Sequence, residues 1–117
     1  MAYSSIVKPT DYFNTVTYAG NGSSPRSITG VGFQPDWVWT KNRSAANSNT
    51  VGDSVRGTGK TIFTDSTSAE LTNNGFGYHS SFDADGFAVT GDTSSAGGDN
   101  VNKSGNNYVS WNWLGAN

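Results

Sequence analysis

Two segments with the pattern W-x-W constrain the fold of this chain more than any other feature. Residues 35–43 read PDWVWTKNR and residues 107–113 read NYVSWNW, so the four tryptophans stand at alternate positions. Alternation is typical of β-strands, in which successive side chains point to opposite faces. Because a buried aromatic ring hides about 150–250 Å² of surface, we expect the indole rings to form the core. The predicted core ribs are Trp37, Trp39, Trp111 and Trp113.

The rest of the chain predicts further short strands joined by turns. Of its 117 residues, 15 are glycine and 13% are aromatic, a mixture that favours strands over helices. Strands are expected within residues 11–18, 26–31, 50–57, 60–65, 75–82 and 87–90, with a hairpin turn at 83–86 and one helical turn within 66–74. This spacing predicts an all-β fold, an antiparallel β-sandwich or jelly roll without substantial helix. We assign residues 1–10 to an N-terminal arm and residues 11–117 to a single β-sandwich domain.

Composition and charge exclude several classes of function. The sequence has no cysteine, which rules out disulfides, thiolate catalysis and cysteine-bound metals. Its net charge is −2 with 14% charged residues, so it lacks the clustered Lys and Arg that nucleic acid or anionic lipid requires. We recognise neither a signal peptide nor an apolar stretch of membrane-spanning length. We therefore expect a protein made in the cytoplasm, with neither nucleic acid nor membrane as a partner.

The single histidine, His79, stands beside residue types that occur in hydrolytic triads. Ser80, Ser81 and Asp83 follow it closely in the sequence. Triad members normally converge from separate segments, and adjacent residues of a strand point to opposite faces. We therefore expect no catalytic residues and no enzyme activity.

Two carboxylates, Asp83 and Asp85, stand next to Gly86 in the predicted hairpin turn. They are weak candidates for ligands of a hard cation such as calcium, which prefers oxygen donors. Aspartate and glycine are also the ordinary residues of tight turns, and this is the interpretation that we favour. We expect no metal and no cofactor.

Asp53 and Arg56 are spaced to meet across a tight turn. The pair can be a local ion pair, which contributes at most about 1 kcal/mol if it is exposed. If Arg56 is half-buried, its fork of donors can instead hold several loop carbonyls. The sequence leaves both interpretations open.

Polar loops are the candidate sites for glycans or partner proteins. Aromatic rings stack on sugars and amides bind hydroxyl groups, so the tryptophan strands could also form a carbohydrate platform. Because burial explains the tryptophans more simply, we place any sugar site in the loops. The candidate residues are Asn42, Asn47, Asn49, Asn102 and Asn106.

Four sequence blocks carry a family resemblance. They are residues 32–43 (GFQPDWVWTKNR), 53–57 (DSVRG), 81–87 (SFDADGF) and 107–113 (NYVSWNW). In this order they resemble a module of tail and tail-fibre-like proteins of marine and freshwater bacteriophages, with the blocks GFxPDxVWxKNR, DSVRG, SFDxDGF and YVxWxW. The resemblance implies a compact, concanavalin-like β-sandwich displayed on a virus particle, and it implies no enzyme.

Our leading hypothesis is a non-enzymatic virion structural protein on the particle surface, in a tail fibre, a head fibre or a capsid decoration. Its partners would be other virion proteins and further copies of itself, with a trimer expected from the symmetry of phage appendages. An edge strand or the arm at residues 2–10 would dock on neighbouring subunits. The alternative hypothesis is a carbohydrate-binding module that recognises host-surface glycans.

Overall fold

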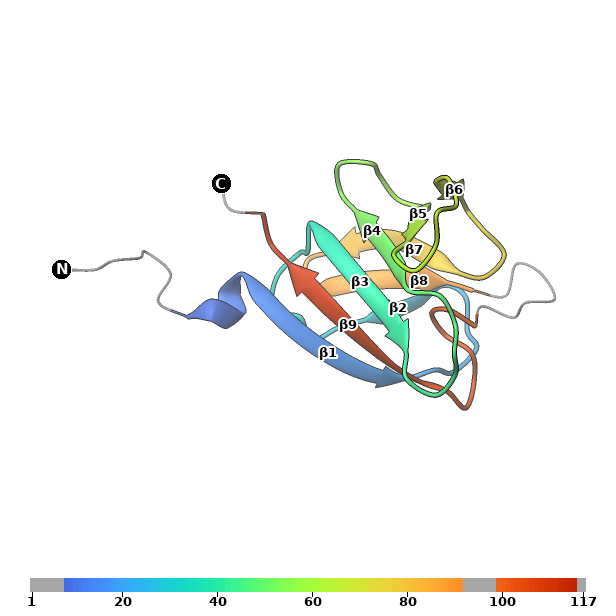
Figure 1. Ribbon diagram of the computed structural model, residues 1–117. Helices are drawn as coiled ribbons and strands as arrows, with labels where there is room; N and C mark the ends of the chain where they lie inside the picture. Colours follow the sequence, from blue (N-terminus) through green and yellow to red (C-terminus); the bar gives the residue numbers. More distant parts are fainter. Residues whose placement is uncertain (1–7, 92–98, 116–117) are drawn as a thin grey trace.

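The regular structure consists almost entirely of β-strands (Figure 1). The structure is a computed structural model and describes residues 8–91 and 99–115, so residues 1–7 of the expected arm lie outside the described residues. The strands are β1 (Phe13–Ala19), β2 (Arg26–Ile28), β3 (Trp37–Asn42), β4 (Thr50–Asp53), β5 (Lys60–Phe63), β6 (Leu71–Thr72), β7 (Tyr78–Asp83), β8 (Gly86–Thr90) and β9 (Asn107–Trp113). A short 3₁₀ helix, η1 (Pro9–Asp11), leads into β1. In the described residues, no helix has the length and apolar character needed to cross a membrane.

The larger sheet has six strands in the order β1-β9-β3-β4-β5-β6. At its centre β3 pairs with β9, so that Trp37 lies opposite Trp113 and Trp39 lies opposite Trp111. The two W-x-W segments are therefore neighbouring strands, and their indoles share one face of the sheet. The other side of β9 pairs with β1, which forms one edge.

The smaller sheet has three strands in the order β2-β8-β7 and lies behind the larger one (Figure 1). β7 and β8 form the predicted hairpin, in which Asp83 is paired with Gly86. Residues 26–31 are a strand only as far as Ile28, and this strand pairs with β8. All strand pairings between the described residues are antiparallel, which confirms the predicted β-sandwich class.

The tryptophans do not form the core, and that part of the sequence prediction is wrong. The buried apolar cluster comes from both sheets, from the loop that precedes β3 and from the segment that precedes β9. Its members are Ile28, Val31, Phe33, Val38, Phe87, Val89 and Val101. Along β3 the residues Val38, Thr40 and Asn42 are buried, whereas the tryptophans alternate with them and are only partly buried. The indoles therefore lie on the outer face of the larger sheet.

Polar side chains on the inner face of β3 and β9 explain how these strands are buried without their tryptophans. Asn112 Nδ2 donates to the carbonyl of Asn14 at 3.0 Å and to Ser110 Oγ at 3.1 Å. Across the sandwich, Thr40 Oγ1 lies 2.9 Å from His79 Nε2. Buried polar groups require such partners. Packed sheets lie about 10 Å apart, a gap that these short side chains fit better than the indole rings would.

Residues 66–74 contain no helical turn, so this expectation is also wrong. The segment instead forms β6, in which Leu71 pairs with Thr61 and Thr72 pairs with Lys60. The pairing continues as Asn73 N donates to the carbonyl of Gly59 at 2.9 Å. Pairing with β5, which makes β6 the edge strand of the larger sheet, gives these backbone groups partners that a single isolated turn would not supply.

Candidate functional site

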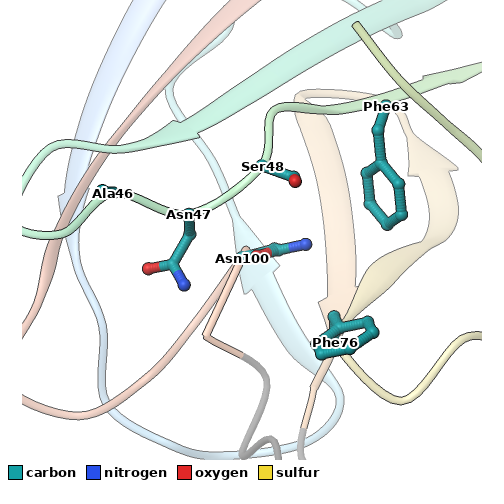
Figure 2. A pocket seen from close by; sticks show the side chains of 6 residues that line it. All are labelled: Ala46, Asn47, Ser48, Phe63, Phe76 and Asn100. Carbon is teal, nitrogen blue, oxygen red and sulfur yellow. The ribbon is translucent and has the colours of Figure 1, made fainter. Parts of the chain in front are cut away.

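A pocket opens at the end of the sandwich where β3 and β5 finish (Figure 2). Its volume is about 200 Å³, and we call it the end pocket. Four segments that are distant in sequence meet here: the loop after β3, the end of β5, the turn before β7 and the segment before β9. The lining residues are Ala46, Asn47, Ser48, Phe63, Phe76 and Asn100.

Two phenylalanines form the apolar wall of the end pocket. Phe63 is the last residue of β5, and its pairing with Thr50 fixes its backbone. Phe76 lies on a turn held by the Asn74 side chain, which accepts from Phe76 N at 3.0 Å and donates to the carbonyl of Gly77 at 3.1 Å. The Phe76 side chain is 51% exposed. A fixed backbone therefore presents an open ring face at the mouth of the pocket.

The polar part of the end pocket is formed by amides. Asn100 is only 3% exposed, and its backbone is fixed because Asn100 N donates to the carbonyl of Phe76 at 3.1 Å. Its side-chain amide has no hydrogen bond to any residue that the structure describes, and its nitrogen points toward the space between Phe63 and Phe76 (Figure 2). Asn47 uses Oδ1 to accept from Asn42 Nδ2 at 2.8 Å, which leaves its own NH₂ group for other partners.

The loop that carries Asn47 is held by a charged side chain behind it. Lys41 Nζ donates to the carbonyls of Asn42 at 2.8 Å, Ala45 at 3.2 Å and Asn47 at 3.0 Å. These bonds occupy all three donors of the ammonium group. Among the residues that the structure describes, no charged side chain lines the end pocket, which combines two phenylalanine rings with neutral polar groups.

Of the asparagines predicted to bind a glycan, only Asn47 lines the pocket. Asn42 and Asn102 are 1% and 2% exposed and have structural roles, so their assignment as binding residues is wrong. Asn42 donates to the carbonyl of Asp99 at 2.9 Å, and Asn102 donates to the carbonyl of Ser23 at 2.7 Å. Asn49 bonds Thr64 Oγ1 at 3.0 Å, and Asn106 lies in the turn before β9; neither residue lines the pocket.

Sequence reasoning missed Phe63, Phe76 and Asn100. The sequence predicts a strand over each of Phe63 and Phe76, but the approach of the two rings at one end of the sandwich depends on how β5 and β7 are placed. Asn100 stands within a long polar stretch, residues 91–105. Nothing in the pattern of that stretch distinguishes it from the other asparagines there. Its adjacency to the buried Val101 is the one local signal that it points inward.

Arg56 combines the two roles that the sequence left open. Its side chain is 22% exposed, and Nε lies 2.5 Å from Asp53 Oδ2 while Nη1 lies 3.1 Å from Glu70 Oε2. Nη2 donates to the carbonyl of Val51 at 3.1 Å. Partial burial opposes ionisation of Asp53, but the hydrogen bonds from Arg56 are stronger and lower the pKa of that carboxyl. Arg56 therefore ties β4 to the segment that leads into β6.

Asp83 and Asp85 act within the hairpin. Asp85 Oδ1 accepts from Gly32 N at 2.7 Å and Oδ2 accepts from Gly30 N at 3.1 Å. These bonds lower the pKa of Asp85. Asp83 accepts from Ser81 Oγ at 3.1 Å. Both oxygens of Asp85 are thus used to hold the loop between β2 and β3, and no group of three potential metal ligands occurs within residues 8–91 and 99–115.

His79 lies between the sheets and is 1% exposed. Burial, together with the charge of Arg56, lowers the pKa of His79 to about 3. Its neighbour Thr40 is fully buried, so the histidine and the hydroxyl that it contacts are closed to a substrate. The ring packs edge-on against Phe87 with centroids 5.4 Å apart.

The outer face of the larger sheet carries a row of aromatic rings that we call the outer aromatic face. Its residues are Phe13, Trp37, Trp39, Trp111 and Trp113. Neighbouring rings pack with centroids 4.4 Å apart for Trp37 and Trp113 and 4.6 Å apart for Phe13 and Trp113. Phe13 and Trp113 remain 37% and 38% exposed. Its two most exposed rings, Phe13 and Trp113, lie beside the start of β3, whereas the end pocket lies beyond the end of this strand.

A family model described as "Domain of unknown function (DUF7483)" matches residues 8–117. The match covers both sheets, the end pocket and the outer aromatic face. Neither the curated proteins nor the solved structures gave a match to the chain.

Proposed function

The chain belongs to the DUF7483 family, and we propose that it is a non-enzymatic structural protein exposed on the surface of a bacteriophage particle. It would act in a tail fibre, a head fibre or a capsid decoration. The proposal rests on the four sequence blocks that resemble phage tail and tail-fibre-like proteins and on a surface suited to assembly. Its partners are other proteins of the particle and further copies of the chain.

The outer aromatic face is the observation that carries the proposal. Soluble monomers rarely expose large contiguous apolar patches, and such patches mark sites of protein–protein contact. Five rings from β1, β3 and β9 are contiguous here on a sheet side that the smaller sheet does not cover, and Phe13 and Trp113 are 37% and 38% exposed. Aromatic residues are also enriched in the centres of protein interfaces. The face therefore suits packing against a neighbouring protein of the particle.

The four blocks of the resemblance belong to the framework of the domain. They supply the paired strands β3 and β9, the turn held by Arg56 and the hairpin held by Asp85. None of the residues that line the end pocket falls within a block. The resemblance thus concerns a rigid frame and its outer face, which favours a mechanical role over a chemical one.

A non-enzymatic role also agrees with the position of the histidine. General acid–base catalysis needs a group that reaches the substrate and titrates near the working pH. His79 is enclosed between the sheets, and its pKa of about 3 is far below neutral pH. A threonine hydroxyl lies 2.9 Å from its ring, but Thr40 is equally inaccessible.

Quantitative mass spectrometry of purified particles tests the proposal. The copy number of this protein would be measured against the major capsid protein, in particles separated from the lysate by density. We expect the protein in the particle fraction. A ratio near that of the capsid protein would indicate a decoration, whereas a few copies per particle would indicate a tail or fibre component.

Absence of the protein from purified particles would contradict the proposed virion role. If the protein is abundant in the infected lysate but absent from intact particles, it is not a virion component. A parallel measurement of the major capsid protein shows that the particles were recovered, so a negative result cannot be attributed to their loss.

A further inference from the structure

We propose that the end pocket binds a single neutral pyranose ring, either as a free sugar or as the terminal unit of a glycan. The inference concerns a binding site and does not depend on a virion role. The pocket volume of about 200 Å³ lies below the roughly 300–1,000 Å³ of pockets for drug-sized ligands. The space therefore suits one small ring better than a peptide or a nucleotide.

Phe76 provides the stacking surface of the proposed site. One face of a pyranose carries C–H groups, and this face packs against an aromatic ring through the burial of apolar surface. The Phe76 ring is 51% exposed, which is far more than the 9% of Phe63 deeper in the pocket. Phe76 would thus cover the face of the sugar while Phe63 closes the floor.

Asn100 provides the polar recognition of the proposed site. Asn100 is only 3% exposed, and its side-chain amide, which has no hydrogen-bond partner among the described residues, points into the pocket (Figure 2). The amide atoms are not among the enclosed polar atoms that lack a partner, so they face the open space of the pocket, where a ligand can reach them. An asparagine side chain offers both a donor and an acceptor, and adjacent sugar hydroxyls complement such a pair.

The charge of the pocket selects between classes of sugar. The six lining residues carry no ionisable side chain, and the nearby ammonium of Lys41 is already bonded to three carbonyls. A uronic acid or a phosphorylated sugar would therefore enter without a counter-charge, which is unfavourable in a partly buried site. The free NH₂ group of Asn47 adds a second neutral donor at the rim.

Binding can be measured on the whole chain by two-dimensional ¹H–¹⁵N NMR. The neutral probes are glucose, galactose, mannose and N-acetylglucosamine, and glucuronic acid is the charged comparison. A second titration uses a neutral oligosaccharide that ends in whichever sugar binds. For at least one neutral sugar we expect saturable shifts at residues 46–48, 63, 76 and 100, including the side-chain amide of Asn100. Glucuronic acid should produce none. Tighter binding of the oligosaccharide would assign the natural ligand to a glycan end, and equal binding would assign it to a free sugar.

Matched substitutions test the two residues that carry the proposal. Asn100→Asp keeps the shape of the side chain but removes its donor and adds a charge, and Phe76→Ala removes the stacking ring. Each should weaken binding at least tenfold. The controls are Asn107→Asp and Phe13→Ala, which change exposed residues outside the pocket and should leave the dissociation constant within about twofold.

Three outcomes would overturn the proposal. The first is the absence of shifts for every neutral sugar at 50 mM or so, a concentration well above the millimolar range of weak binding. The second is a set of shifts that maps away from the end pocket. The third is unchanged binding in both Asn100→Asp and Phe76→Ala. The NMR spectrum of each variant shows directly whether it is folded, and none of these outcomes bears on the presence of the protein in particles.

Discussion

At the scale of single residues, the interior is organised by a neutral histidine. His79 contacts Thr40 across the sandwich and packs on Phe87, and Gly52 gives it the room to do so. A Cβ atom on Gly52 would lie 2.6 Å from His79 Nδ1, so glycine is the residue that fits. The histidine is buried in its uncharged form because burial strongly disfavours the imidazolium.

This buried histidine predicts that mild acid destabilises the fold. The pKa of His79 is about 3 in the folded state and about 6.5 in an unfolded chain. Between these values the unfolded state binds the additional proton, so the free energy of unfolding falls as the pH is lowered. We expect a loss of about 2 kcal/mol between pH 7 and pH 5, measured by urea unfolding at each pH.

The substitution His79→Gln provides the control, because glutamine retains a hydrogen-bonding group but does not titrate. The lowered pKa values of Asp53 and Asp85 affect the free energy of unfolding only at more acidic pH, because an aspartate in an unfolded chain takes up its proton at about pH 3.9. The slope between pH 7 and pH 5 should therefore disappear in the variant, whatever its absolute stability. An unchanged slope would mean that His79 is not buried in its neutral form.

At the scale of elements, the hairpin of β7 and β8 shows how a short sequence block fixes a long connection. Asp85 holds the backbone N–H groups of Gly30 and Gly32, and its carbonyl accepts from Val31 N at 3.1 Å. Gly86 lets β2 approach closely, because a Cβ there would lie 1.9 Å from the carbonyl oxygen of Ile28. The block that reads as a turn signal in sequence is thus also the anchor of the segment that leads into β3.

The sequence predicted most strands but not which face of the central pair is buried. Alternation along β3 and β9 separates two sets of side chains, yet it does not say which set points inward. Because the indoles are large and apolar, the sequence predicts that their face is buried. The face that is in fact buried carries the polar side chains of Thr40, Ser110 and Asn112. Their burial depends on partners in β1 and β7, and these partners are known only once the strands are paired.

Because the tryptophans lie on the outer face of the larger sheet, substitutions there should lower the free energy of unfolding less than substitutions in the core. Phe87→Ala empties a fully buried position and should reduce the free energy of unfolding by about 3–5 kcal/mol. Trp113→Ala removes a larger ring that is 38% exposed, and we expect a loss of at most about 2 kcal/mol because solvent replaces part of its contacts. Chemical denaturation of both variants measures the difference. A greater loss of unfolding free energy for Trp113→Ala than for Phe87→Ala would contradict the placement of the tryptophans outside the core.

At the scale of the whole molecule, the two sheets differ in size, and this difference creates the two surfaces of interest. One side of the six-stranded sheet packs on the three-stranded sheet, and its other side leaves the outer aromatic face uncovered. At the far end of β3, segments from both sheets enclose the end pocket (Figure 2). From the sequence, the polar loop at residues 42–49 is a candidate binding site, and it does border this pocket. The convergence of Phe63, Phe76 and Asn100 depends on tertiary structure and leaves no pattern along the chain.

The separation of the two surfaces predicts that assembly and ligand binding can be uncoupled. If the outer aromatic face packs on a neighbouring particle protein, Trp113→Ser places a polar group in the centre of that contact, where desolvation is costly. The variant should fold, because the ring is already partly exposed, but its copy number in purified particles should fall at least tenfold. Asn100→Asp alters only the end pocket and should be incorporated normally. Mass spectrometry of particles from phage carrying each variant gene measures both. Normal incorporation of Trp113→Ser, with its fold verified by circular dichroism, would show that the aromatic row does not hold the protein on the particle.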